Sequence, residues 1–180
     1  MKNIFLAVLS LIAFLFLRPK KVKAPTIKTS NDLYPGTDCA IMAGDLLFSP
    51  IGKSESKYVG HVGFVMDTNE VVHSIPSGLA RDSISTYFKK FRGITLYRPK
   101  STQSGSIAAL YMEDLFATYP KALYRVWTPL GTSDYEQYCT KLVWQAYYFG
   151  SNINLGHLPL SAKAVHPVRI KDRKYLKRKW

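Results

Sequence analysis

Hydrophobic and polar positions alternate most clearly in two short segments before the middle of the chain. Residues 60–66 (Gly-His-Val-Gly-Phe-Val-Met) and 71–75 (Val-Val-His-Ser-Ile) are rich in β-branched and aromatic residues, and the polar residues 67–70 separate them. Two such segments joined by a short polar turn are typical of an antiparallel hairpin. We therefore predict a β-hairpin over residues 60–75.

The register of this hairpin decides whether its two histidines, His61 and His73, share a face. Side chains alternate between the faces of a sheet, so an odd number of loop residues keeps both rings on one side and an even number separates them. A loop over residues 67–69 would place His61 opposite Ile75 and make His73 its diagonal neighbour, with β carbons roughly 7–8 Å apart. We predict this arrangement, which brings the two imidazoles within reach of each other.

A helical period begins at Cys139. The apolar residues that follow it at one helix face are Leu142, Val143, Ala146 and Tyr147. Gly150 is a helix stop. Residues 133–136 (Ser-Asp-Tyr-Glu) have the pattern of a capping box, which would start the helix earlier, but we predict the later start at Cys139. A sulfur at the first turn lies near unpaired backbone N–H groups and the positive end of the helix dipole, which lowers a thiol pKa.

The two histidines and the cysteine together fit nucleophilic catalysis. A thiolate is the reactive form of cysteine, and a nearby imidazole can take its proton and return it to a leaving group. We therefore assign Cys139 as nucleophile, His61 as general base and His73 as the residue that orients His61. The backbone N–H of Cys139 is a candidate oxyanion donor. Singly, each histidine is more often a half-buried strand residue and the cysteine a small buried hydrophobe; the combination favours chemistry.

The remaining pattern predicts short helices and strands. These are a helix over 82–91 capped by Asp82, a strand over 94–97, a helix over 106–119 with Ile107, Leu110 and Tyr111 on one side and Pro120 as its stop, and a last strand over 123–127. The fold class is therefore α+β, with a small antiparallel sheet packed against the helix that carries Cys139.

Four segments, in their order along the chain, resemble the permuted branch of the NlpC-type papain-like cysteine hydrolases. They are residues 44–48 (Gly-Asp-Leu-Leu-Phe), 60–65, 71–74 and 138–143, and weaker marks lie at 82–99 and 165–167. This branch includes the YaeF/YiiX-like amidases and, more remotely, the lecithin:retinol acyltransferase-like enzymes. The resemblance covers residues 43–169. It implies a circularly permuted papain-like fold, Cys139 as nucleophile, His61 as general base and a third catalytic residue on the strand of His73.

The N-terminus carries an apolar run over residues 4–17, followed by the basic segment 18–23. Its length is that of a signal-peptide core and short for a membrane span. Basic residues stand where a cleavable signal has small neutral ones, so we expect an uncleaved membrane anchor, with cleavage after Ala24 as the alternative. Positive charge after the run favours a cytoplasmic side, whereas an enzyme acting on envelope polymers needs export, so the orientation stays open.

Length and composition fit one catalytic domain. The chain has 180 residues, of which 47% are hydrophobic, enough for one core without a second large domain. We predict a signal or anchor over 1–24, a linker over 25–42, the hydrolase domain over 43–170 and a basic tail over 171–180. The two cysteines, Cys39 and Cys139, do not make a disulfide framework, and a bridge between them would disable the nucleophile.

The net charge of +13 is concentrated at the two ends of the chain. The domain between them is only mildly basic and has no nucleic-acid-binding motif, so we expect no nucleic-acid partner. The basic ends would contact anionic lipid or wall polymer, or would simply be solvated.

The resulting functional prediction is an amide-cleaving cysteine hydrolase acting on a cell-wall peptide or an N-acyl substrate through a thioester acyl-enzyme. No metal or organic cofactor is implied. The alternatives are a lipid acyltransferase or thioesterase of the same fold and a catalytically inactive binding module. Tyr138, Trp144 and Tyr58 are candidate cleft residues, although aromatic side chains are as often part of the core.

Overall fold

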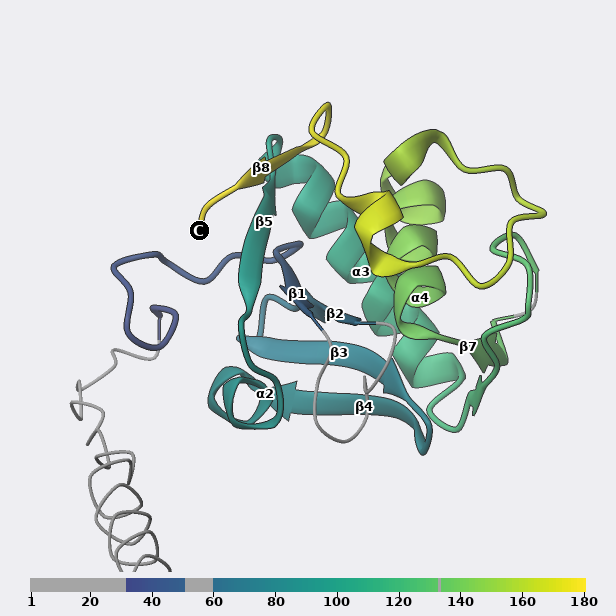
Figure 1. The fold of residues 1–180 in the computed structure, drawn as a ribbon, viewed down its shortest axis with the longest axis horizontal. Helices are drawn as coiled ribbons and strands as arrows, with labels where there is room; N and C mark the ends of the chain where they lie inside the picture. Colours follow the sequence, from purple (N-terminus) through teal and green to yellow (C-terminus); the bar gives the residue numbers. More distant parts are fainter. Residues whose placement is uncertain (1–31, 51–59, 133) are drawn as a thin grey trace, which may run out of the picture.

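An antiparallel sheet of six strands, in the order β4-β3-β2-β1-β5-β8, forms the centre of the molecule (Figure 1). This computed structural model describes residues 32–50, 60–132 and 134–180. The strands are β1 (Leu46–Ser49), β2 (His61–Val65), β3 (Glu70–Ile75), β4 (Gly78–Ser83), β5 (Thr95–Pro99) and β8 (Leu176–Arg178). A separate two-stranded parallel sheet consists of β6 (Leu123–Tyr124) and β7 (Glu136–Gln137).

Helices cover both faces of this sheet. They are α2 (Ile84–Lys90), α3 (Thr102–Thr118), α4 (Cys139–Gln145) with its π-helical continuation η1 (Ala146–Gly150), and the 3₁₀ turns η2 (Leu155–His157) and η3 (Pro167–Ile170). The predicted α+β class and the antiparallel sheet packed against the helix of Cys139 are therefore confirmed. The predicted start of that helix at Cys139 is also confirmed.

Alternation along the central strands divides the core into two clusters. Leu46, Phe48 and Val62 point to the face covered by α3 and α4. Leu47 and Val65 point to the opposite face, where they pack with side chains of α2. This is the pattern expected of a sheet buried on both sides, in which neighbouring residues of one strand belong to different clusters.

The predicted hairpin is confirmed, including its loop. The backbone N–H of Met66 donates to the carbonyl of Glu70 at 2.8 Å, which leaves three loop residues, and Asn69 adopts the left-handed conformation with φ of 58°. Continued along the strands, this register sets His61 across from Ile75. Both histidines consequently lie on the face covered by α2.

The helix predicted over 106–119 is α3, but it begins four residues earlier and buries another face than expected. Its buried residues are Gly105, Ala108, Ala109, Met112 and Leu115, whereas Leu110 is 69% exposed. The face is set by how closely the helix can approach the sheet. A Cβ on Gly44 would lie 2.3 Å from the Cα of Gly105, so only glycine fits at this crossing.

The segment that follows the hairpin also differs from its prediction. Residues 78–83 form β4, a strand that the sequence did not predict, and Asp82 lies within it. The cap of α2 is Ser83, whose hydroxyl accepts the N–H of Thr86 at 3.2 Å, so the predicted capping role of Asp82 is wrong. The strand predicted over 123–127 is limited to β6 and is not the last, since β8 follows it.

Parts of the predicted linker and tail belong to the folded domain. Tyr34, assigned to the linker, is fully buried, and Leu176, assigned to the tail, is 2% exposed and starts the edge strand β8. Composition missed both because single apolar side chains anchor otherwise polar segments. The predicted membrane anchor over 4–17 lies outside the described residues. Within the described ranges, no helix has the length and apolar character that a membrane crossing needs.

Candidate active site

His61 and His73 are joined in a buried hydrogen-bonded series that ends at a carboxylate. Nε2 of His61 lies 3.1 Å from Nδ1 of His73, and Nε2 of His73 lies 2.9 Å from Oδ2 of Asp82. Lys90 of α2 donates to Oδ1 of Asp82 at 2.9 Å. His61 is 3% exposed and His73 is fully buried. We call His61, His73 and Asp82 the histidine relay.

The carboxylate fixes the tautomers of both rings. Asp82 can only accept, so Nε2 of His73 carries the proton and its Nδ1 accepts from Nε2–H of His61. In a neutral His61 the remaining nitrogen, Nδ1, therefore holds a free lone pair. Within the described segments this nitrogen has no hydrogen-bond partner, and it is the atom of the relay that can accept a proton.

Two aromatic side chains, Tyr87 of α2 and the C-terminal cap residue Phe91, enclose the relay. The ring of Phe91 stacks on His61 with centroids 4.4 Å apart, and Tyr87 meets His73 edge-on at 5.3 Å. Tyr87 also donates its hydroxyl to the carbonyl of Leu47 at 3.0 Å. Gly63 makes this packing possible because a Cβ there would lie 2.8 Å from the Tyr87 ring. The rings exclude water from the histidines.

Burial keeps both imidazoles neutral. Desolvation, with a contribution from His73, holds the pKa of His61 well below its ordinary value. The pKa of His73 is also lowered, since desolvation outweighs the hydrogen bond to Asp82. Desolvation acts to raise the pKa of Asp82, but the hydrogen bonds from Lys90 and His73 outweigh it and hold that pKa below its ordinary value. The relay thus consists of two neutral rings and one anion.

The lowered histidine pKa values predict a loss of stability in acid. Below pH 6.5, the ordinary pKa of histidine, the unfolded chain binds protons that the buried rings of His61 and His73 refuse. The free energy of unfolding therefore falls with decreasing pH, by up to about 1.4 kcal/mol per pH unit for each ring. Urea denaturation between about pH 8 and pH 5 measures this slope. The slope should be shallower in His61→Gln, and an equal slope in that variant would contradict the assignment.

Cys139 is the first residue of α4 and is 7% exposed. Burial raises the pKa of its thiol above the ordinary value, while the backbone N–H groups of Val62 and Thr140 and the Thr140 hydroxyl act in the opposite direction. The N–H groups at the helix N-terminus act to lower this pKa, as expected, but the expected net lowering is wrong because burial has the larger effect. Desolvation of a thiolate outweighs the helix dipole at this depth. At neutral pH the thiol is protonated.

Cys139 approaches the relay at the end of the β2–β3 ladder. This ladder consists of the pairs Phe64–Val72 and Val65–Val71, and beyond it the N–H of Val62 faces the sulfur. His61 directly precedes Val62. Burial raises the pKa of Tyr87, whose ring packs on His73, and the charge of Cys139 acts in the same direction.

The sulfur and the base are not hydrogen-bonded to each other. Within the described residues, the Cys139 sulfur lies 3.9 Å from the Thr140 hydroxyl and faces the backbone N–H of Val62. The structure therefore joins His61 to His73 directly. It places the Cys139 sulfur at the neighbouring Val62, in the core cluster on the α4 face, whereas the His61 ring stacks on Phe91 on the α2 face. Catalytic hydrogen bonds are often long before substrate binds.

Two of the remaining candidate cleft residues, Tyr138 and Trp144, belong to the hydrophobic core. Tyr138 is 2% exposed and its hydroxyl accepts the N–H of Val165 at 3.3 Å, and Trp144 is fully buried, so both are core side chains. Tyr58 lies outside the described residues. Cys39 and Cys139 are free thiols, as expected.

The fold and the site define a class, an α+β domain with a buried His–His–Asp series beside a helix-terminal cysteine. No protein-family profile matches the chain. It is 30% identical over 123 residues to an uncharacterized 30.3 kDa protein of Bacillus thuringiensis, a match that covers 62% of this chain and 45% of that protein. The chain thus spans less than half the length of this relative.

A solved structure shares the fold. The crystal structure of the metalloprotein yiiX from Escherichia coli O157:H7, designated DUF1105, superposes with a TM-score of 0.56 at 16% identity. The match covers 78% of this chain and 97% of that chain. The fold of this protein is therefore yiiX-like, in agreement with the YaeF/YiiX part of the sequence resemblance.

The description of yiiX as a metalloprotein belongs to that protein. In the described part of this chain, no group of three or more His, Cys, Asp or Glu side chains is arranged to hold a metal ion. Three of the four ring nitrogens of the relay are occupied by one another and by Asp82. The described residues therefore do not fit a metal site.

Proposed function

We propose that this protein is a cysteine hydrolase that cleaves an amide bond through a thioester on Cys139. The observation that carries the proposal is the relay from Asp82 through His73 to His61, which leaves Nδ1 of His61 as a base on the strand that reaches the sulfur. A nucleophile, a base and an oriented partner for the base are the parts that such chemistry needs.

The raised thiol pKa and the lowered histidine pKa values favour proton transfer during attack over a resting ion pair. The sulfur of Cys139 bonds to the substrate carbonyl carbon while its proton moves to Nδ1 of His61. The resulting oxyanion accepts the backbone N–H of Cys139. His61 then gives the proton to the leaving amine, the C–N bond breaks, and a thioester remains.

In the second half of the reaction, water hydrolyses the thioester. Nδ1 of His61 takes a proton from water, whose oxygen adds to the thioester carbon. As the C–S bond breaks, His61 returns this proton to the sulfur, so that the acid leaves and the thiol of Cys139 is restored. In both halves, His61 becomes an imidazolium whose charge is balanced through His73 by the anion of Asp82.

We also propose a family and a substrate class for this domain. We assign the domain to the permuted NlpC-type papain-like hydrolases, supported by the order of the histidine strands before the cysteine helix and by the yiiX-like fold. The substrate is a cell-wall peptide or an N-acyl amide, and the apolar run over 4–17 holds the domain at the membrane or in the envelope.

Mass spectrometry of the intact protein tests this proposal. The protein is incubated with N-acyl amides, wall peptides and phospholipids, and acyl adducts are located by peptide mapping. An adduct on Cys139 that hydroxylamine removes is expected with an amide substrate, and it should persist in Cys39→Ala, the matched free thiol, and disappear in Cys139→Ala.

Three outcomes would change the assignment. An adduct from phospholipid alone would support the acyltransferase alternative, which is favoured by the resemblance of the histidine spacing to that of the lecithin:retinol acyltransferase-like enzymes. An adduct on Cys39 alone would contradict the site. If no adduct forms and iodoacetamide labels Cys139 equally slowly in the native protein and in His61→Ala, the protein is an inactive binding module.

A further inference from the structure

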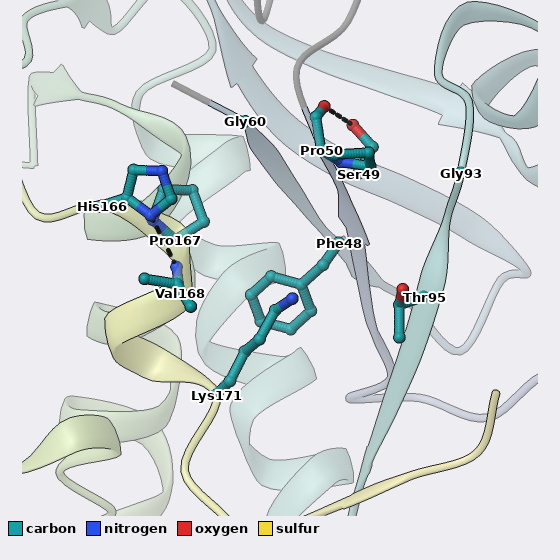
Figure 2. Close-up of a pocket in the computed structure, with 10 residues that line it drawn as sticks. All are labelled: Phe48, Ser49, Pro50, Gly60, Gly93, Thr95, His166, Pro167, Val168 and Lys171. Carbon is teal, nitrogen blue, oxygen red and sulfur yellow. Dashed lines mark hydrogen bonds between the residues drawn. The ribbon is translucent and has the colours of Figure 1, made fainter. Parts of the chain in front are cut away.

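A cavity of about 400 Å³ lies between β1 and η3, beside the strand end that carries His61 (Figure 2). The residues that line it are Phe48, Ser49, Pro50, Gly60, Gly93, Thr95, His166, Pro167, Val168 and Lys171. Gly60 directly precedes His61, and Ser49 is paired with His61 across the β1–β2 ladder. Phe48 belongs to the same core cluster as Cys139, so the cavity opens on the face of the sheet that α4 covers.

Lys171 brings a positive charge to the cavity that no carboxylate of the described residues pairs with. Nζ of Lys171 lies over the Phe48 ring, 4.8 Å from its centroid, and 5.4 Å from that of Tyr97 (Figure 2). None of the described lining residues is acidic, and the described residues give Lys171 no ion-pair partner. After partial burial, the charge that most affects its pKa is that of Arg178, which has the same sign.

His166 adds a second donor to the same cavity. Its Nδ1 accepts the N–H of Val168 at 3.1 Å, so Nε2 of the neutral ring carries a proton. Figure 2 shows this ring and the Lys171 side chain on the η3 side of the cavity, with Phe48 and Pro50 across from them. Two donors beside apolar walls match a carboxylate on a short apolar stem.

We propose that this cavity binds a carboxylate of the substrate, held by Lys171 and His166, with the adjoining apolar carbons against Phe48 and Pro50. The inference rests on the proposed function and narrows it, because the substrate becomes a peptide or acyl amide with a free carboxylate near the scissile bond. The ammonium that now lies over an aromatic ring gains a charged partner when this substrate binds.

Calorimetric titration of the Cys139→Ala variant tests the proposal independently of turnover. The probes are N-acetyl-alanyl-alanine, which ends in a carboxylate, and the same peptide ending in a carboxamide. We expect the carboxylate probe to bind about tenfold more tightly than the carboxamide, the size of one charge-assisted hydrogen bond. Adding Lys171→Met, which keeps the apolar stem, should abolish this preference, and His166→Gln should reduce it.

Lys174→Met is the matched control. Its Nζ also lies over an aromatic ring, 5.0 Å from that of Tyr175, but it does not line the cavity, so the carboxylate preference should be unchanged. Equal affinity for the two probes, no measurable binding of the carboxylate probe, or a preference that survives Lys171→Met would overturn the proposal. None of these results depends on an acyl adduct at Cys139, whose absence would instead count against the proposed function.

Discussion

Replacing Asp82 with asparagine is expected to lower kcat by up to about 10⁴-fold, the loss seen when the orienting carboxylate of a catalytic triad is replaced by an amide. The carboxylate can only accept, whereas the asparagine amide can donate to Nε2 of His73. That donation reverses the proton order of the relay, so that Nδ1–H of His73 donates to Nε2 of His61. Nδ1 of His61 then carries a proton and is no longer a base. The variant also loses the anion that balances the imidazolium.

The rate of Cys139 alkylation by iodoacetamide, measured in a Cys39→Ala background, reports this change without a known substrate. The rate should fall in Asp82→Asn at neutral pH and should converge with the parent rate at high pH, where the thiol ionises without a base. Glu113→Gln is the control, because this exposed carboxylate also pairs with a basic side chain, Arg81, at 2.7 Å. Equal alkylation profiles for Asp82→Asn and its parent would exclude a role for the relay.

The pairing of the two histidines was predictable because it depends on local rules. Loop length and the alternation of side chains set the register, and both can be counted in the sequence between His61 and His73. Asp82 was not predicted, although the turn residues Pro76, Ser77 and Gly78 mark a second hairpin that returns it to His73. Its position just before an amphipathic segment is equally typical of a helix cap, and the adjacent Ser83 takes that role.

Properties that depend on depth in the fold were the ones that sequence reasoning missed. The position of Cys139 at a helix N-terminus was predicted, but the direction of its pKa shift depends on tertiary burial. The prediction of which face of α3 is buried was wrong for a similar reason. Contact between Gly44 and Gly105 brings the helix close to the sheet and leaves Leu110 exposed.

A second large effect is expected at Asp45, which the sequence singled out only within the segment 44–48. Its carboxylate is fully buried and accepts the Tyr34 hydroxyl at 2.7 Å and two guanidinium N–H groups of Arg98, at 2.8 and 2.7 Å. These bonds hold the segment before β1 against β5. Asp45→Ala leaves the Arg98 charge and the Tyr34 hydroxyl without this partner, so we expect the free energy of unfolding to fall by about 3–5 kcal/mol.

Urea denaturation of Asp45→Ala and of a control, Glu113→Ala, measures the difference. The Glu113 pair with Arg81 has the same 2.7 Å separation but is exposed, so its loss should cost less than about 1 kcal/mol. The comparison isolates burial, since both variants break an arginine–carboxylate pair. A similar small loss in both would show that the Asp45 network adds little to stability. Because Asp45 is not part of the relay, iodoacetamide should still alkylate Cys139 of Asp45→Ala at the parent rate, at temperatures where the variant remains folded.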